Sequence, residues 1–110
     1  MDHVKVMLLD RICERIVDIE EGLMYGTISF SYDSMMSAMK PGHPMEILDS
    51  IQAEIFFDVK AGVVPELSHV KNVLDGLIAF KKTFKVKELT PVIKDLKDYV
   101  KFAESTDELN

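Results

Sequence analysis

The apolar residues of the chain recur at helical spacing over most of its length. Between Asp2 and Tyr25 the intervals alternate between three and four residues, which is the spacing of a helix seam. The residues of this stripe are Leu9, Ile12, Ile16, Ile19 and Leu23. Asp2 is a suitable N-cap, and Gly26 is a suitable stop. The pattern therefore predicts a first helix over residues 2–25.

Prolines and glycines divide the second half of the chain. A helix is expected from Pro44 to Gly62 and another from Pro65 onwards, because proline fits the first turn of a helix. Gly76 lies inside the latter helix, where glycine costs about 1 kcal/mol relative to alanine, and this predicts a close helix crossing there.

A proline interrupts the last apolar stripe, which otherwise keeps helical spacing from Val86 to Ala103. An interior proline costs about 3 kcal/mol, and Thr90 just before Pro91 is a good N-cap. We therefore expect a helical turn, then a helix over residues 91–104, and a frayed tail over residues 105–110.

Residues 27–45 are the least regular part of the chain. Residues 27–32 alternate polar and apolar side chains as a strand does, but no second strand exists in the sequence for them to pair with. We expect an extended connection, followed by a short helix over residues 33–39 and a break at residues 41–44.

These elements predict an all-α fold, an antiparallel bundle of four main helices plus one short helix, in a single domain over residues 1–110. The first helix would span about 36 Å, more than the others, so part of its stripe would lack cover within one chain. We therefore expect a homodimer. Its interface residues would be Leu9, Ile12, Ile16 and Ile19.

Composition narrows the class of protein. The chain has 110 residues, of which 47% are hydrophobic and 29% charged, as in ordinary globular proteins. No apolar run is long enough to cross a bilayer, and charged residues near the N-terminus break up any signal-peptide core. One cysteine permits no internal disulfide. We expect a cytoplasmic protein without membrane contact.

No arrangement typical of catalysis is visible. Cys13 lies among aliphatic residues of the first helix, where a thiol is buried and inert, and no glycine pair has phosphate-loop spacing. The acidic residues of the same helix, Glu20 among them, are expected on its solvated face. We predict that the protein is not an enzyme and uses no cofactor.

Two alternatives rest on specific residues. Glu66 and His69 have the Glu-x-x-His spacing found in metal-binding bundles, so a metal- or small-ligand-binding bundle is one alternative. It would need a second such motif, supplied by a dimer.

The second alternative rests on charge. The chain carries a net charge of −6, but residues 81–101 contain seven lysines against three acidic residues. Such a basic stretch suits a nucleic-acid accessory protein. The simpler interpretation is that this basic helix packs beside the acidic helices.

The leading prediction is a non-enzymatic protein–protein interaction module, namely an adaptor, small chaperone or regulatory subunit that acts as a homodimeric bundle. Aromatic residues and adaptable methionines between positions 28 and 39 suit contact with a protein partner. The predicted contact residues are Ile28, Phe30, Tyr32, Met35, Met36 and Met39.

Overall fold

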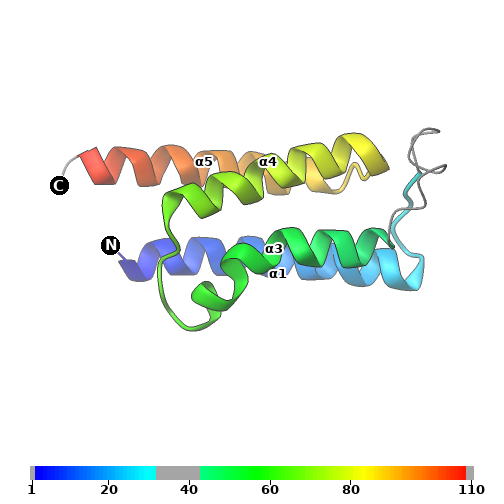
Figure 1. The fold of residues 1–110 in the computed structure, drawn as a ribbon, viewed down its shortest axis with the longest axis horizontal. Helices are drawn as coiled ribbons and strands as arrows, with labels where there is room; N and C mark the ends of the chain where they lie inside the picture. The colour runs from blue at the N-terminus through cyan, green and yellow to red at the C-terminus, as the bar shows by residue number, and fades with distance from the viewer. Residues whose placement is uncertain (1, 32–42, 109–110) are drawn as a thin grey trace.

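The computed structural model describes residues 2–31 and 43–108, and these residues form four helices and no strand (Figure 1). The helices are α1 (Asp2–Tyr25), α3 (Pro44–Lys60), α4 (Leu67–Phe84) and α5 (Leu89–Glu108). The predicted all-α class is confirmed. The predicted short helix over residues 33–39 lies outside the described residues.

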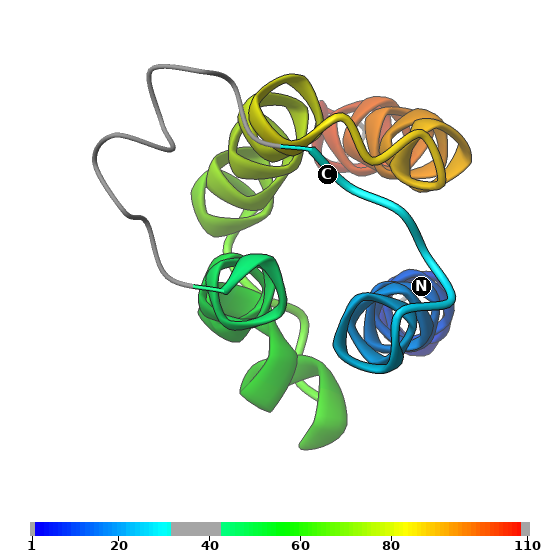
Figure 2. The same ribbon diagram turned by 90° about the vertical axis from the view of Figure 1, so that its right-hand side faces the viewer.

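The four helices pack side by side as a bundle. Helix α1 contacts α3 and α5, and α4 contacts the same two helices, so the bundle is roughly square in cross-section (Figure 2). Each helix runs antiparallel to the helices that it contacts (Figure 1). The long axis of the molecule follows the helices, with principal extents of 48 × 23 × 20 Å.

Helix α1 ends as its sequence predicts. Gly26 adopts a φ of 80°, a left-handed conformation that glycine reaches without a steric penalty. The backbone N–H of Thr27 then donates to the carbonyl of Gly22 at 2.9 Å. This is the Schellman closure of a helix C-terminus, and it redirects the chain across the end of the bundle.

Helix α5 is longer at both ends than predicted. It begins at Leu89, so the expectation that Thr90 caps a helix starting at Pro91 is wrong. Pro91 is the third residue of the helix, where a backbone N–H has no intrahelical partner in any case. At the other end the helix continues to Glu108, and an ion pair of 2.9 Å joins Glu104 to Lys71 of α4.

The added length of α5 changes the role of the apolar stripe on α1. With 20 residues, α5 extends about 30 Å, and it packs against α1 together with α3. The four side chains expected at a homodimer interface are at most 6% exposed within a single chain, and they lie in its core. They are Leu9, Ile12, Ile16 and Ile19.

The close crossing predicted at Gly76 is present between α3 and α4. A Cβ atom at this position would lie 2.8 Å from Cγ2 of Ile51 on α3. Because real Cβ atoms are not found that close to another carbon, the missing side chain is what allows the two helices to approach here.

Candidate functional site

The residues predicted to bind a partner are only partly described, and those that are described take part in the fold. Residues 26–31 cross the end of the bundle from α1 towards the C-terminus of α4 (Figure 2). There the backbone N–H of Ser31 donates to the carbonyl of Phe84 at 2.9 Å.

Ile28 and Phe30 are half-buried in this crossing and pack against the core. Ile28 lies directly over Gly22, where an added Cβ would be 2.5 Å from its Cδ1 atom. Both side chains therefore close the end of the bundle within the chain itself. The other predicted contact residues, Tyr32, Met35, Met36 and Met39, lie outside the described residues.

A groove lies between α1 and α5. Its volume is about 470 Å³, within the range of pockets that hold ligands or partner side chains. Ile12 and Tyr99 form its floor, each only 4% exposed, while Leu8 and Phe102 are half-buried in its walls. The bottom of the groove is therefore apolar.

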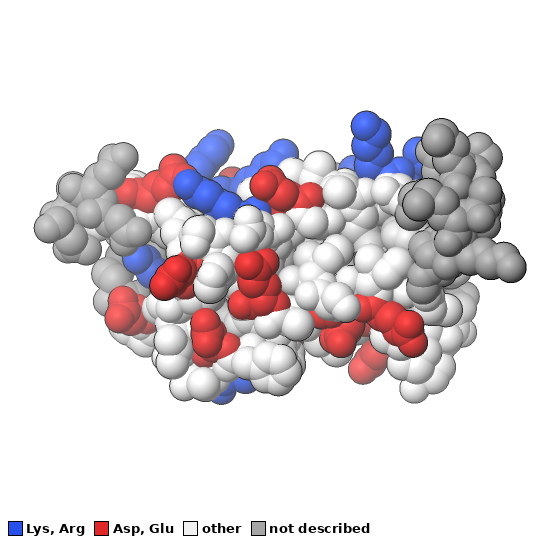
Figure 3. All heavy atoms as spheres, in the orientation of Figure 1, with Lys and Arg blue, Asp and Glu red and all other residues white. Residues whose placement is uncertain are grey.

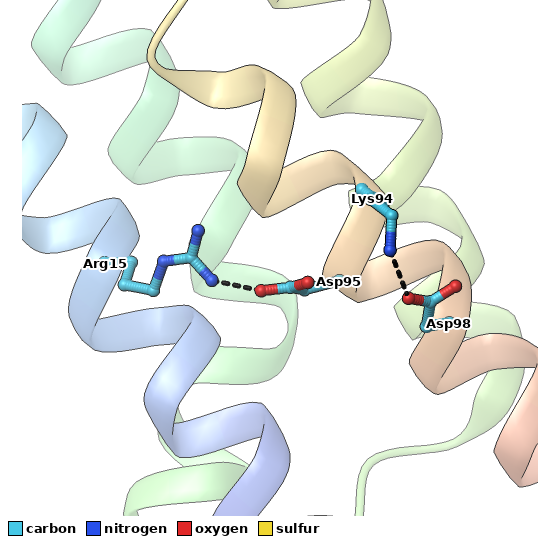
Figure 4. Close-up of polar contacts among 4 residues, drawn as sticks. All are labelled: Arg15, Lys94, Asp95 and Asp98. Carbon is cyan, nitrogen blue, oxygen red and sulfur yellow. Dashed lines mark hydrogen bonds and ion pairs between the residues drawn. The ribbon is translucent and has the colours of Figure 1, made fainter.

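Charged side chains border this groove, and each helix contributes a single sign. Helix α1 supplies Arg11 and Arg15, and α5 supplies Asp95 and Asp98. The Arg15 guanidinium forms an ion pair with Asp95 across the seam (Figure 4). Asp98 instead pairs with Lys94 of its own helix at 3.1 Å.

Of the four charged residues at this border, Arg11 is the one that has no ion-pair partner among the described residues. Its side chain is exposed and lies on α1 one turn before Arg15. A cation with no partner next to an apolar floor is available to an acidic group from another molecule.

The groove was not predicted from the sequence, because its two walls lie 80 positions apart in the chain. A local signal did exist. Leu8, Arg11 and Arg15 follow one another at helical spacing, and so do Asp95, Asp98 and Phe102, which places each set on one side of its helix.

A buried acid, Glu20, lies in the other seam of α1, next to the exposed Asp49 of α3. Glu20 is 8% exposed, contrary to the expectation that it lies on a solvated face. The pKa of Glu20 is raised to about 7, mainly by burial and in addition by the charge of Asp49, a hydrogen bond with that side chain and the charge of Glu21. Its Oε1 atom is buried and accepts no hydrogen bond from the residues described.

The two candidate metal ligands, Glu66 and His69, lie at the start of α4. Glu66 occupies the N-cap position without a side-chain capping bond, and His69 is half-buried in the first turn. Within residues 2–31 and 43–108, no three histidine, cysteine or acidic side chains gather as a metal site would require.

Cys13 is fully buried in the core. Its burial raises the pKa of the thiol to about 11, an effect that the nearby Lys60 partly offsets and neighbouring acidic residues reinforce. The thiol is therefore protonated near neutral pH and is a poor nucleophile, as its sequence context predicts.

The basic helix α5 packs beside the acidic helix α1, but no lysine of residues 81–101 forms an ion pair with a described residue of α1 or α3. The described ion pairs of this stretch are Arg15–Asp95, in which α5 supplies the anion, and Lys94–Asp98 within α5. Lys81, Lys94 and Lys97 surround a depression of about 240 Å³ between α4 and α5. In Figure 3 most basic side chains lie along the α4–α5 side, whereas the α3 side is mainly acidic.

None of the described helices is both long and apolar enough to cross a membrane. Comparison of the chain with protein-family models, curated protein sequences and solved structures finds no match.

Proposed function

We propose that this protein is a non-enzymatic protein–protein interaction module and that the α1–α5 groove receives a helix of its partner. The observation that carries the proposal is an apolar floor of Ile12 and Tyr99 between two charged borders of opposite sign. An adaptor, a small chaperone or a regulatory subunit would use such a surface.

The shape of the groove favours a helix as its occupant. Each wall spans about two helical turns, residues 8–15 on α1 and residues 95–102 on α5, which is about 11 Å. An amphipathic helix presents apolar residues at intervals of three and four and so places them along such a floor. Charged residues on its flanks would face Arg11 on one side and Asp98 on the other.

Affinity and orientation would then come from different parts of the site. Burying apolar surface contributes about 25 cal/mol per Å², so the floor supplies most of the binding energy. Exposed border charges contribute less to affinity, but they distinguish the two orientations of a bound helix and discriminate against wrong partners.

Substitution of a groove aromatic tests the proposal against a matched control. Phe102→Asp introduces a charge into the groove wall, whereas Phe57→Asp makes the same change at a side chain of α3 that is 72% exposed. Tagged wild type and both variants are used for affinity capture from the source cells, followed by quantitative mass spectrometry. We expect specific partners to be retained by wild type and Phe57→Asp and lost from Phe102→Asp.

The circular dichroism spectra and melting curves of both variants establish that they remain folded. Equal retention of every captured protein by the two variants would contradict the groove as the docking surface. A small apolar molecule bound by wild type, with no protein partner, would replace the proposal by a ligand-binding function.

A second candidate function is the binding of nucleic acid by the lysines of residues 81–101. One observation favours it: six of these seven lysines form no ion pair with a described residue. Affinity for RNA and DNA oligonucleotides, measured by fluorescence anisotropy, should then fall steeply as salt rises. Absence of binding at low salt would exclude this function.

A further inference from the structure

The charges around the α1–α5 groove are arranged so that this face complements itself. We propose that the groove docks onto the same groove of a second copy of the chain, around a twofold axis parallel to the helices. This inference rests on the proposed function of the groove as a docking surface, and it names the occupant.

The register between α1 and α5 determines which residues lie at the same level. The Arg15–Asp95 ion pair joins the two antiparallel helices at one level. One turn back along α1 lies Arg11, and one turn further along α5 lies Asp98, so these two residues share the next level. Leu8 and Phe102 share the level after that.

A twofold axis parallel to the helices preserves these levels and exchanges the two sides of the face. It places α1 of one copy opposite α5 of the other. Arg11 then meets Asp98 of the second copy, and the symmetric contact forms as well, because an isologous interface repeats every pair. Leu8 likewise meets Phe102 of the second copy, which closes the apolar floor between the two molecules.

The other way of placing the two faces together is disfavoured by charge. A twofold axis across the helices would lay α1 on α1 and α5 on α5. Arginines would then face arginines and aspartates would face aspartates, and like charges at an interface suppress association. The distribution of charge therefore selects one of the two symmetric arrangements.

The face is large enough for a specific dimer. It is formed by α1 and α5, which are about 36 and 30 Å long, and it is about as wide as a short axis of the molecule, 20–23 Å. Standard interfaces bury about 800 Å² on each partner, and a face of these dimensions accommodates that area.

Reversal of one charge at a time tests this arrangement. Arg11→Glu and Asp98→Lys change exposed side chains and should leave the fold intact, as circular dichroism would establish. Sedimentation velocity over the micromolar range measures self-association of wild type and of each variant. We expect wild type to dimerise and each variant to dissociate about tenfold more readily, because each homodimer then contains two like-charge contacts.

A mixture of the two variants is the decisive sample. In the mixed dimer, Glu at position 11 faces Lys at position 98, and the remaining Asp98 faces the remaining Arg11, so all contacts are again between opposite charges. We expect the mixture to associate about as strongly as wild type. A contact within one chain cannot be restored by mixing two proteins, so this result would locate the contact between copies.

Three outcomes would overturn the inference: a monomeric wild type, a dimer that neither reversal weakens, or a mixture that stays dissociated. Lys97→Glu on the outer side of α5 is the matched control and should not change association. If wild type is monomeric but Phe102→Asp still loses the captured partners, only this inference fails. If Phe102→Asp loses none of them, the proposed function fails.

Discussion

Helix α1 has two seams, one with α3 and one with α5, and charged side chains are placed differently in them. Against α3, the carboxyl of Glu20 is buried beside that of Asp49. Against α5, the charged residues that line the groove stay at its border, and Ile12 and Tyr99 lie beneath them. The same helix therefore has one seam whose stability depends on a proton and another whose surface is available to another molecule.

The difference shows where electrostatics can act in this protein. A buried carboxyl loses its hydration when it ionises, so it holds a proton to a higher pH. Border charges such as Arg15 and Asp95 have side chains 39% and 46% exposed, so solvent screens them and they contribute little to folding. The stability of the α1–α3 seam should therefore depend on pH, whereas the border of the α1–α5 seam should be sensitive to salt and to binding partners.

The largest effect should come from truncating a core residue of α1. Ile16 is completely buried, and truncation of such a side chain to alanine costs about 2 to 5 kcal/mol. We therefore expect Ile16→Ala to lower the free energy of unfolding by that amount in urea denaturation. Ile78→Ala, at a residue 40% exposed on α4, is the control and should cost far less. A loss below 1 kcal/mol for Ile16→Ala would mean that α1 is not packed as described.

A smaller effect is expected from the buried acid. Folding raises the pKa of Glu20 from 4.5 to about 7, so between these values the folded chain binds more protons than the unfolded chain. Stability should therefore fall as pH rises through this window, and the full penalty should remain above it. We expect Glu20→Gln to remove this dependence and to add about 2 kcal/mol to the free energy of unfolding above neutral pH.

Denaturant titrations at several pH values measure this effect, and Glu14→Gln, at an exposed position of the same helix, is the matched control. If wild type and Glu20→Gln kept the same pH dependence, the α1–α3 seam would not contain a proton-dependent group.

The smallest effect should come from the border of the other seam. Arg15→Gln removes the ion pair with Asp95, and exposed pairs contribute about 0.2 to 1 kcal/mol. We expect thermal unfolding to show a loss within that range that shrinks as salt is added. If Arg15→Gln lost more stability than Glu20→Gln gained, the comparison of the two seams would be reversed, because the border charges would then be a main contributor to folding.

The sequence predicted the helices well because their signals are local. The stop at Gly26 and the helix start at Pro44 depend on residues within one turn, and both agree with the structure. The start of α5 was misplaced because proline is tolerated at any of the first positions of a helix, so Pro91 alone does not determine the boundary.

The candidate site could not be predicted, because it depends on contacts between distant parts of the chain. Whether the α1 stripe is covered depends on the length of α5, and the pairing of Arg15 with Asp95 depends on their register across 80 positions. Glu20 lies four residues after Ile16 and three before Leu23, both of them buried, so helical spacing does place it beside the apolar stripe. The approach of Asp49 from α3 is the part that the sequence does not reveal.

The burial of Cys13 has a practical consequence for studying this protein. Since it is the chain's sole cysteine and is fully buried, a thiol reagent can modify the native chain only when α1 separates from the other helices. The rate of modification is thus an intrinsic reporter of opening. A cysteine introduced elsewhere on the surface would carry a fluorophore or spin label at a single position, with the natural thiol left in place.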